Sequence, residues 1–270
     1  SCGEDVNAPS KRIMVERKRL TASDKWSNIL IENATNFSNN DDCRLGNFFT
    51  VKRGIATGDN DFFVVNMDTI EKYHIPKKFL KPVLPSPRFL KENIILSDNE
   101  GNITLEQKQF LFSCGLPEDI LKEKYPSVWE YIQEGIKRGI NKGYICSHRP
   151  LWYFCEDRKP APFVIPYMGR GDSSKKMFRF ILNKTKAITT NVYLLLYPKE
   201  NYSKCLTDTN LLNEVWQTLN EVTSEQFAIN GREYGGGLHK LEPKELLNIK
   251  VPTLSSLLMP RQSFYEPTLF

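Results

Sequence analysis

The sequence predicts an α+β fold, in which a mixed, mostly antiparallel β-sheet packs with a few helices. Three observations lead to this prediction. Runs of β-branched, aliphatic and aromatic residues, typical of strands, occur at 62–65, 144–168 and 178–198. Two other segments, 126–139 and 211–222, place their apolar residues at helical spacing. Strands and helices do not alternate regularly, as they would in a βαβ fold, and this order favours α+β.

The first 44 residues are predicted to form a strand and a linker. The charged segment 11–20 is typical of an edge strand, with Ile13 and Val15 on one face. Residues 33–42 are polar and are the best candidate for a hinge. Because the chain begins without Met, we expect it to be an excised fragment in which residues 1–44 lead from a missing catalytic domain.

Residues 45–252 are expected to form the main domain. It begins with an extended segment, a glycine-punctuated turn and the strand at 62–65. The segment 76–90 is rich in proline, so we expect it to lack regular structure and to run over the surface. The first helix starts at Pro126, and Gly139 marks its end.

In the second half of this domain, residues 178–198 are predicted to form two strands around a polar turn. A short helix with Pro243 in its first turn and an extended exit should follow Leu241, which leaves 253–270 as a C-terminal tail. The apolar positions assigned to the buried faces of the two longer helices are Val128, Tyr131, Ile132, Leu212, Val215, Trp216 and Leu219.

Composition sets limits on the class of protein. With 40% hydrophobic and 26% charged residues, the chain is expected to fold. A net charge of +5 is too small to establish a polyanionic partner, so the positions of the cations must decide. No apolar run is long enough for a membrane span and no signal peptide is present, so we expect a cytoplasmic protein. The six cysteines form no CxxC pair, which favours reduced thiols over a metal site.

Catalytic motifs are missing from this sequence. The glycine-containing segment 54–60 resembles a phosphate loop, but we expect a strand after it and therefore no helix N-terminus for a phosphate. No Asn or Asp is followed by Pro-Pro and an aromatic residue, as is needed to hold a flipped adenine. Glu16 and Lys18 have the spacing of a nuclease motif, but only Asp5 precedes them as a metal ligand. The chain is therefore predicted to hold no catalytic residue, metal or cofactor.

Four segments combine cations, small residues and aromatics. In the first, a basic pair precedes a flexible turn whose backbone can approach a ligand closely, although a plain β-turn is the alternative. In the second, Arg149 lies among aromatic residues, which suits phosphate contact and base stacking, although an aromatic core strand is the alternative. The candidate residues of these two segments are Lys52, Arg53, Gly54, Thr57, Gly58, Asn60 and Arg149.

The third segment, 167–191, is dense in cations that could neutralise phosphates, although a solvated hairpin is the alternative. The fourth, 229–246, contains three consecutive glycines, which require a special backbone path. Arginine there can bind guanine with two hydrogen bonds, and glutamate can accept one from cytosine N4. The candidate residues of these two segments are Arg170, Lys184, Lys186, Asn191, Arg232, Glu233, Tyr234, Gly236, His239 and Lys240.

Together these segments resemble the C-terminal target recognition domain of TaqI-like and Eco57I-like adenine-N6 DNA methyltransferases. The matching stretches are LGNFFTVKRGIATGDNDFFVV, FLKPVLPSPRFL, RPLWYF, FRFILNKTKAITTN and INGREYGGGLHKLEPKELLNIKVP. The resemblance implies a domain that recognises double-stranded DNA for a restriction-modification enzyme. It also implies that the partner is the protein's own catalytic domain, where S-adenosylmethionine and the flipped adenine would bind.

Other functions remain open on sequence alone. The chain could be a specificity subunit of a multi-subunit restriction system, although such subunits carry two recognition domains and long helices. It could also be a fragment of a nuclease-fused restriction enzyme, a nuclease that uses Glu16 and Lys18, or an RNA-binding module.

Overall fold

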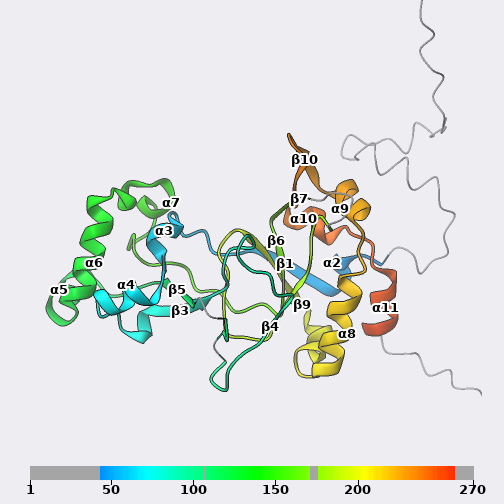
Figure 1. Cartoon of the computed structure of the whole chain (residues 1–270), viewed down its shortest axis with the longest axis horizontal. Helices are drawn as coiled ribbons and strands as arrows, with labels where there is room; N and C mark the ends of the chain where they lie inside the picture. Colours follow the sequence, from blue (N-terminus) through cyan, green and yellow to red (C-terminus); the bar gives the residue numbers. More distant parts are fainter. Residues whose placement is uncertain (1–42, 102, 106–107, 171–175, 259–270) are drawn as a thin grey trace, which may run out of the picture. The chain divides into compact units, whose positions relative to one another are not determined.

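The structure is a computed structural model that describes residues 43–101, 103–105, 108–170 and 176–258 (Figure 1). The strand expected at 11–20, the hinge expected at 33–42 and the pair Glu16 and Lys18 lie outside these residues. The helices are α2 (Leu45–Phe48), α3 (Asn60–Phe63), α4 (Met67–Lys72), η2 (Lys77–Phe79), α5 (Glu118–Lys124), α6 (Pro126–Lys137), η3 (Ile140–Lys142), α7 (Tyr144–Ser147), η4 (Glu200–Leu206), α8 (Thr209–Leu219), α9 (Ser224–Asn230), α10 (Pro243–Leu247) and α11 (Pro252–Leu258).

The described residues form a five-stranded sheet in the order β1-β9-β6-β8-β4 and two three-stranded sheets, β10-β11-β7 and β2-β5-β3. Only β4 and β8 pair in parallel among these strands, so the predicted α+β fold with a mostly antiparallel sheet is confirmed. The strands are β1 (Phe49–Arg53), β2 (Val64–Val65), β3 (Leu80–Val83), β4 (Ile94–Ile95), β5 (Gln109–Phe112), β6 (Phe163–Pro166), β7 (Met168–Arg170), β8 (Ile181–Asn183), β9 (Tyr193–Pro198), β10 (Arg232–Tyr234) and β11 (Leu238–Lys240).

Both faces of the five-stranded sheet are buried. In β9, Leu194 and Leu196 belong to one core cluster, whereas Tyr193 and Leu195 belong to another. Successive side chains of a strand point to opposite faces, which explains this division. The first cluster also contains buried residues of α2, α8, α9, α10 and α11, so these helices supply the core on that face (Figure 1).

A separate core cluster lies around β2-β5-β3, α5 and α6. The ring of Phe62 stacks on that of Tyr131, with 4.7 Å between the centroids. The hydroxyl of Tyr131 donates a hydrogen bond to the carbonyl of Phe62. Stacking and hydrogen bonding together fix the end of α3 against α6.

Several predicted elements are confirmed. The helix expected at 126–139 is α6, which ends before Gly139, a residue with the left-handed φ of +76°. The helix expected at 211–222 is α8, and Val215 and Leu219 lie on its buried face. The short helix after Leu241 is α10, with Pro243 in its first turn.

Three predictions of local structure were wrong. At 62–65, the first two residues end helix α3, because the Asp59 carboxylate accepts a hydrogen bond from the Phe62 amide and caps a turn of helix. Between 144 and 168, only β6 and the start of β7 are strand, and the aromatic stretch before them is helix α7 and loop. In 76–90, residues 80–83 form β3 and Leu90 is buried. Pro82 is tolerated because β3 is an edge strand.

The two strands expected in 178–198 are present as β8 and β9, but they do not form a hairpin. Each pairs with β6, which lies between them. The connecting turn is largely buried, since the Asn183 side chain binds the carbonyls of Ala161 and Ala187 and accepts from the Thr185 hydroxyl. A solvated hairpin is therefore excluded for this segment.

Residues expected in the C-terminal tail continue the fold. Helix α11 contains Leu254, which is fully buried in the cluster that covers the five-stranded sheet. The core therefore extends past residue 252.

Within the described part of the chain, no helix is long and apolar enough to cross a membrane. The described cysteines Cys43, Cys114, Cys146 and Cys155 are free thiols. Burial raises the pKa of Cys114, Cys146 and Cys155, so these thiols stay protonated at neutral pH.

Candidate nucleic-acid interface

The sheet β10-β11-β7 brings together the third and fourth segments singled out in the sequence. Arg170 at the end of β7 pairs with Leu238 of β11, and Tyr234 of β10 pairs with the same Leu238 from the other side. Every residue of β10 is exposed, which includes Arg232, Glu233 and Tyr234. Arg170 is exposed as well. This small sheet therefore presents two arginines, a carboxylate and an aromatic ring to solvent.

The turn between β10 and β11 consists of the three glycines. Gly236 and Gly237 have left-handed φ values of +74° and +68°, which side chains rarely adopt. No atom lies within 4 Å of a Cβ placed on any of the three, so packing does not require glycine here. The hairpin tip therefore stands in open space, and the predicted special backbone path is confirmed.

His239 lies on the protected face of β11, opposite Gly169 of β7. It is 8% exposed, and its Nδ1 has no hydrogen-bond partner among the described residues. Gly169 is required by packing, because a Cβ there would lie 2.1 Å from the Met177 carbonyl oxygen. The β11–β7 pair is thus held close to Met177 and Phe178, which precede β8.

Tyr167, between β6 and β7, organises a cluster of charges beside this sheet. The Arg53 guanidinium lies over its ring at 3.9 Å from the centroid, and its hydroxyl donates to Glu242 Oε1 at 2.6 Å. Lys240 Nζ is 3.0 Å from the same carboxylate and 5.2 Å from the ring centroid. Arg53 at the end of β1 is therefore linked to Lys240 of the hairpin through one tyrosine.

The electrostatics of this cluster follow from these contacts. The hydrogen bond from Tyr167, followed by the bond and charge of Lys240, holds the pKa of Glu242 below its usual value. The hydrogen bonds of Lys240 to Tyr167 and Glu242 raise the pKa of that lysine. Burial, followed by the bond to Glu242, raises the pKa of Tyr167. Lys240 and Glu242 are therefore both charged at neutral pH, with Tyr167 neutral between them.

The loop 54–60 follows Arg53 and is packed against two other parts of the chain. At Gly54, a Cβ would lie 2.0 Å from the Thr190 carbonyl oxygen. Glycine is therefore needed here to let the backbone of the loop approach the backbone of Thr190. Thr57 is 2% exposed, and its hydroxyl donates to Asn60 Oδ1 at 2.7 Å. At Gly58, which has a φ of +98°, a Cβ would lie 2.6 Å from Cys146 Sγ. Gly58 and Asn60 remain exposed.

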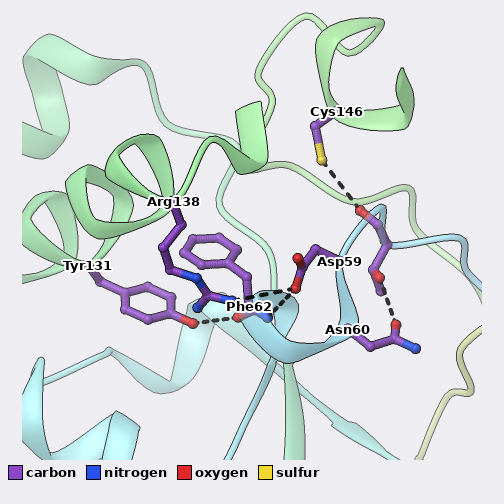
Figure 2. Close-up of polar contacts among 7 residues, drawn as sticks. Asp59, Asn60, Phe62, Tyr131, Arg138 and Cys146 are labelled. Atoms are coloured by element: carbon purple, nitrogen blue, oxygen red, sulfur yellow. Dashed lines mark hydrogen bonds and ion pairs between the residues drawn. The ribbon is translucent and has the colours of Figure 1, made fainter. Parts of the chain in front are cut away.

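Figure 2 shows how Asp59 fixes this loop to α6. Its carboxylate accepts from the Phe62 amide at 2.8 Å and lies 3.8 Å from the Arg138 guanidinium. The expectation that no helix follows the loop was wrong, because α3 begins at Asn60. This helix has only four residues and its N-terminus is capped by Asp59, so it offers no place for a phosphate.

Arg149 makes its contacts inside the protein. Nη2 donates to the Ala56 carbonyl at 2.6 Å, and the guanidinium lies 5.4 Å from the centroid of the Phe63 ring. Nη1 donates to the Trp152 carbonyl at 3.4 Å. Arg149 therefore positions the loop 54–60 against the segment that follows α7.

The remaining candidates divide into two groups. The amide of Asn191 donates to the Ile55 carbonyl at 2.9 Å, so the structure brings this residue to the loop 54–60. Lys186 Nζ instead donates to the Glu100 carbonyl at 2.7 Å. Lys184 lines a separate cavity between Pro160 and Thr209. No contact of either lysine with the loop or the hairpin is found among the described residues.

Sequence reasoning missed Tyr167, Glu242 and Glu245. Glu245 Oε1 lies 3.1 Å from Arg232 Nε and orients that arginine. Tyr167 could have been found, since it is the first residue of the segment 167–191, which contains Arg170. Glu242 and Glu245 could not be recognised from the sequence. They meet Tyr167, Lys240 and Arg232 only because the start of α10 packs beside the hairpin.

The sequence matches the family described as "Type II methyltransferase M.Eco57I, C-terminal domain" over residues 23–264. The chain belongs to this family. The family that the resemblance indicated is thereby confirmed. A specificity subunit is accordingly not favoured.

Two relatives of this chain are described as Type II methyltransferases. The chain is 30% identical over 198 residues to the Type II methyltransferase M.AccI of Acinetobacter calcoaceticus, an alignment that covers 73% of this chain and 34% of the relative. It is 25% identical over 253 residues to the Type II methyltransferase M.XamI of Xanthomonas campestris pv. amaranthicola. This alignment covers 94% of this chain and 44% of the relative. The chain thus spans less than half the length of these relatives.

A solved structure of the Type IIL restriction-modification enzyme MmeI in complex with DNA is also similar. It shares 11% sequence identity, with 66% of this chain and 24% of that chain covered and a TM-score of 0.37.

Proposed function

We propose that this chain is the target recognition domain of an adenine-N6 DNA methyltransferase of a restriction-modification system. The observation that carries the proposal is the β10–β11 hairpin, whose three exposed side chains at 232–234 and open glycine tip stand on a sheet with Arg170. Membership of the M.Eco57I C-terminal-domain family supports the same function.

A two-stranded β-ribbon fits the major groove of B-DNA, where each base pair presents its own pattern of donors and acceptors. Arg232 would bind guanine O6 and N7, and Glu233 would accept from cytosine N4. Because Glu245 binds Arg232 through Nε, it orients the guanidinium so that the two Nη groups can face a base. Tyr234, at 44% exposure, would pack against a base or sugar.

Phosphate contacts would come from the cations beside the hairpin. Lys52 and Arg53 are exposed at the end of β1, and Arg170 is exposed at the end of β7. The stacking of Arg53 on Tyr167 restricts this side chain before DNA binds, which lowers the entropy lost on binding. These contacts would set affinity and register, whereas the hairpin would select the sequence.

Methyl transfer would take place in another part of the intact protein. The relatives are two to three times longer than the aligned segment, which leaves room for a catalytic domain. We propose that this domain binds S-adenosylmethionine and the flipped adenine, and that it is the partner of the present chain. The expected site of action is the cytoplasm, where the cell's DNA lies.

Selection from a randomised duplex library tests the proposal. The 270-residue chain should enrich one short sequence and bind it more tightly than unselected duplex. Arg232→Ala should weaken binding to the selected duplex by about tenfold or more and relax the preference at one base pair. Lys72→Gln, on the acidic helix α4, is the control and should bind as the unchanged chain does.

Two results would contradict the proposal. One is enrichment of no sequence together with equal affinity for all duplexes. The other is methyl transfer to DNA by the purified chain, since the proposal places this reaction in a separate domain.

A further inference from the structure

The connection between α6 and α7 is basic over a long stretch. Residues 135–155 contain no Asp or Glu. We define the basic turn as residues 137–148, which includes η3 and the whole of α7. Its charged side chains are exposed, and Lys142 has no ion pair with any residue that the structure describes. The cations of the stretch are Lys137, Arg138, Lys142 and Arg149, with His148 beside them.

An unusually exposed aromatic residue lies in this turn. Tyr144, the first residue of α7, is 81% exposed, and the adjacent Ile145 is 37% exposed. The imidazole of His148 lies against the tyrosine with 4.5 Å between ring centroids, and His148 Nδ1 is 2.6 Å from the Tyr144 carbonyl oxygen. The tyrosine is therefore supported by one neighbour, while most of its surface is open to a partner.

The basic turn packs directly against the loop 54–60. The Cys146 thiol donates to the Thr57 carbonyl at 3.7 Å, and Arg138 lies 3.8 Å from Asp59 (Figure 2). Gly58 is so close to Cys146 that no side chain fits between them. The loop begins one residue after Arg53, so residues 54–59 join the end of β1, where phosphate contacts are proposed, to the basic turn.

We propose that the basic turn is a second contact to the same duplex DNA, with Lys142 on a phosphate and Tyr144 packed against a nucleotide. This inference rests on the proposed function. A surface that contacts only water does not require an exposed aromatic ring among its cations. The combination suits the outside of a duplex, where phosphates attract cations and the sugars offer apolar surface to the ring. The absence of acidic residues disfavours a basic protein partner.

Variants at Tyr144 and Lys142 test this inference with the full 270-residue chain and the duplex chosen by selection. Tyr144→Ala should weaken binding roughly tenfold, because covering the exposed ring against the duplex stabilises the complex by about 1–2 kcal/mol. Tyr144→Phe keeps the ring and should bind almost as tightly as the unchanged chain. Lys142→Gln should reduce the slope of log affinity against log salt by about 0.9, the value for one phosphate contact.

Matched controls come from helix α4, which also carries Asp68 and Glu71. Met67→Ala removes an apolar side chain of 45% exposure, and Lys72→Gln removes the same charge as Lys142→Gln. Both should leave affinity and salt slope unchanged. Unfolding by urea should be equal for all variants, since each changed side chain is exposed.

The outcomes separate this inference from the proposed function. If Arg232→Ala weakens binding but Tyr144→Ala and Lys142→Gln do not, the inference is overturned and the proposed function stands. If the unchanged chain binds no duplex, both fail. Competition by single-stranded RNA as effective as that by duplex DNA would overturn the assignment of the turn to duplex DNA.

Discussion

At the scale of single residues, two glycines of this chain differ in whether the fold tolerates a side chain at their position. At Gly54, β1 leaves the sheet and its backbone touches that of residues 189 and 190. At Gly235, nothing lies within 4 Å of a Cβ, and its φ is not left-handed. The first glycine is required by the fold, whereas the second is not.

This difference makes a pair of variants informative. Gly54→Ala places a methyl group 2.0 Å from the Thr190 carbonyl oxygen and should lower the free energy of unfolding by about 1–3 kcal/mol or more. Gly235→Ala should change it by less than about 0.5 kcal/mol. Urea titration of both variants provides the measurement. Equal stability of the two would contradict the backbone contact at Gly54.

Buried tyrosines should make the protein sensitive to alkaline pH. Burial raises the pKa of Tyr153 to about 12, and its hydroxyl donates to the Leu116 carbonyl at 2.8 Å. Unfolding lets this tyrosine ionise near its usual pKa of about 10. The folded chain then holds more protons than the unfolded chain, so the free energy of unfolding falls as pH rises from about 10 toward 12.

Tyr153→Phe should flatten this decline, although it lowers stability at neutral pH by about 1 kcal/mol through the lost hydrogen bond. Urea unfolding followed at several alkaline pH values measures the slope. Trp152→Phe changes a neighbouring ring without a titratable group, so its cost should be the same at every pH. An unchanged slope in Tyr153→Phe would count against the assignment.

At the scale of elements, α11 shows how far the domain reaches. Leu254→Ala should cost about 2–5 kcal/mol, since the side chain is fully buried against the sheet cluster. Ser256→Ala on the exposed side of the same helix should cost less than about 0.5 kcal/mol. Thermal unfolding of both variants gives the comparison. A neutral Leu254→Ala would mean that residues after 252 are a tail.

Elements whose pattern is local were predictable from sequence. Helices α6 and α8 place apolar residues at helical spacing, and Pro243 marks the start of α10. The strand partners were not predictable, because β6 inserts between β8 and β9 through contacts that no local pattern specifies. The aromatic run 151–154 was misread for the same reason, since the rings of Trp152 and Tyr153 pack into a core formed by distant residues.

The candidate site was predictable to a similar degree. The glycine hairpin and Arg53 were found because unusual residues stand together in sequence. Arg149 was found as well, but its role could not be inferred, since its contact with the Ala56 carbonyl depends on a loop that lies 93 residues earlier. The roles of Tyr167 and Glu242 could not be predicted, because they depend on the hydrogen bond between these two residues, which lie far apart in sequence.

At the scale of the whole molecule, a net charge of +5 should steer the chain to DNA only weakly, so individual phosphate contacts should dominate the salt dependence. Each contact contributes about 0.9 to the slope of log affinity against log salt. Lys52→Gln should therefore reduce the slope by about 0.9. Fluorescence anisotropy over a salt series measures it, and an undiminished slope would remove Lys52 from the interface.

Strand β1 has a further consequence, which concerns synthesis of the protein. Its partner in the five-stranded sheet is β9, and Phe49 pairs with Pro198. At ribosomal speeds of about 5–20 residues per second, β1 must wait roughly 7–30 seconds for its partner to emerge. During that time its hydrogen-bonding groups and Phe49 are open to other nascent chains. A cell that makes many copies of this protein at once should therefore need chaperones to shield the first strand until the last strand of its sheet has been synthesised.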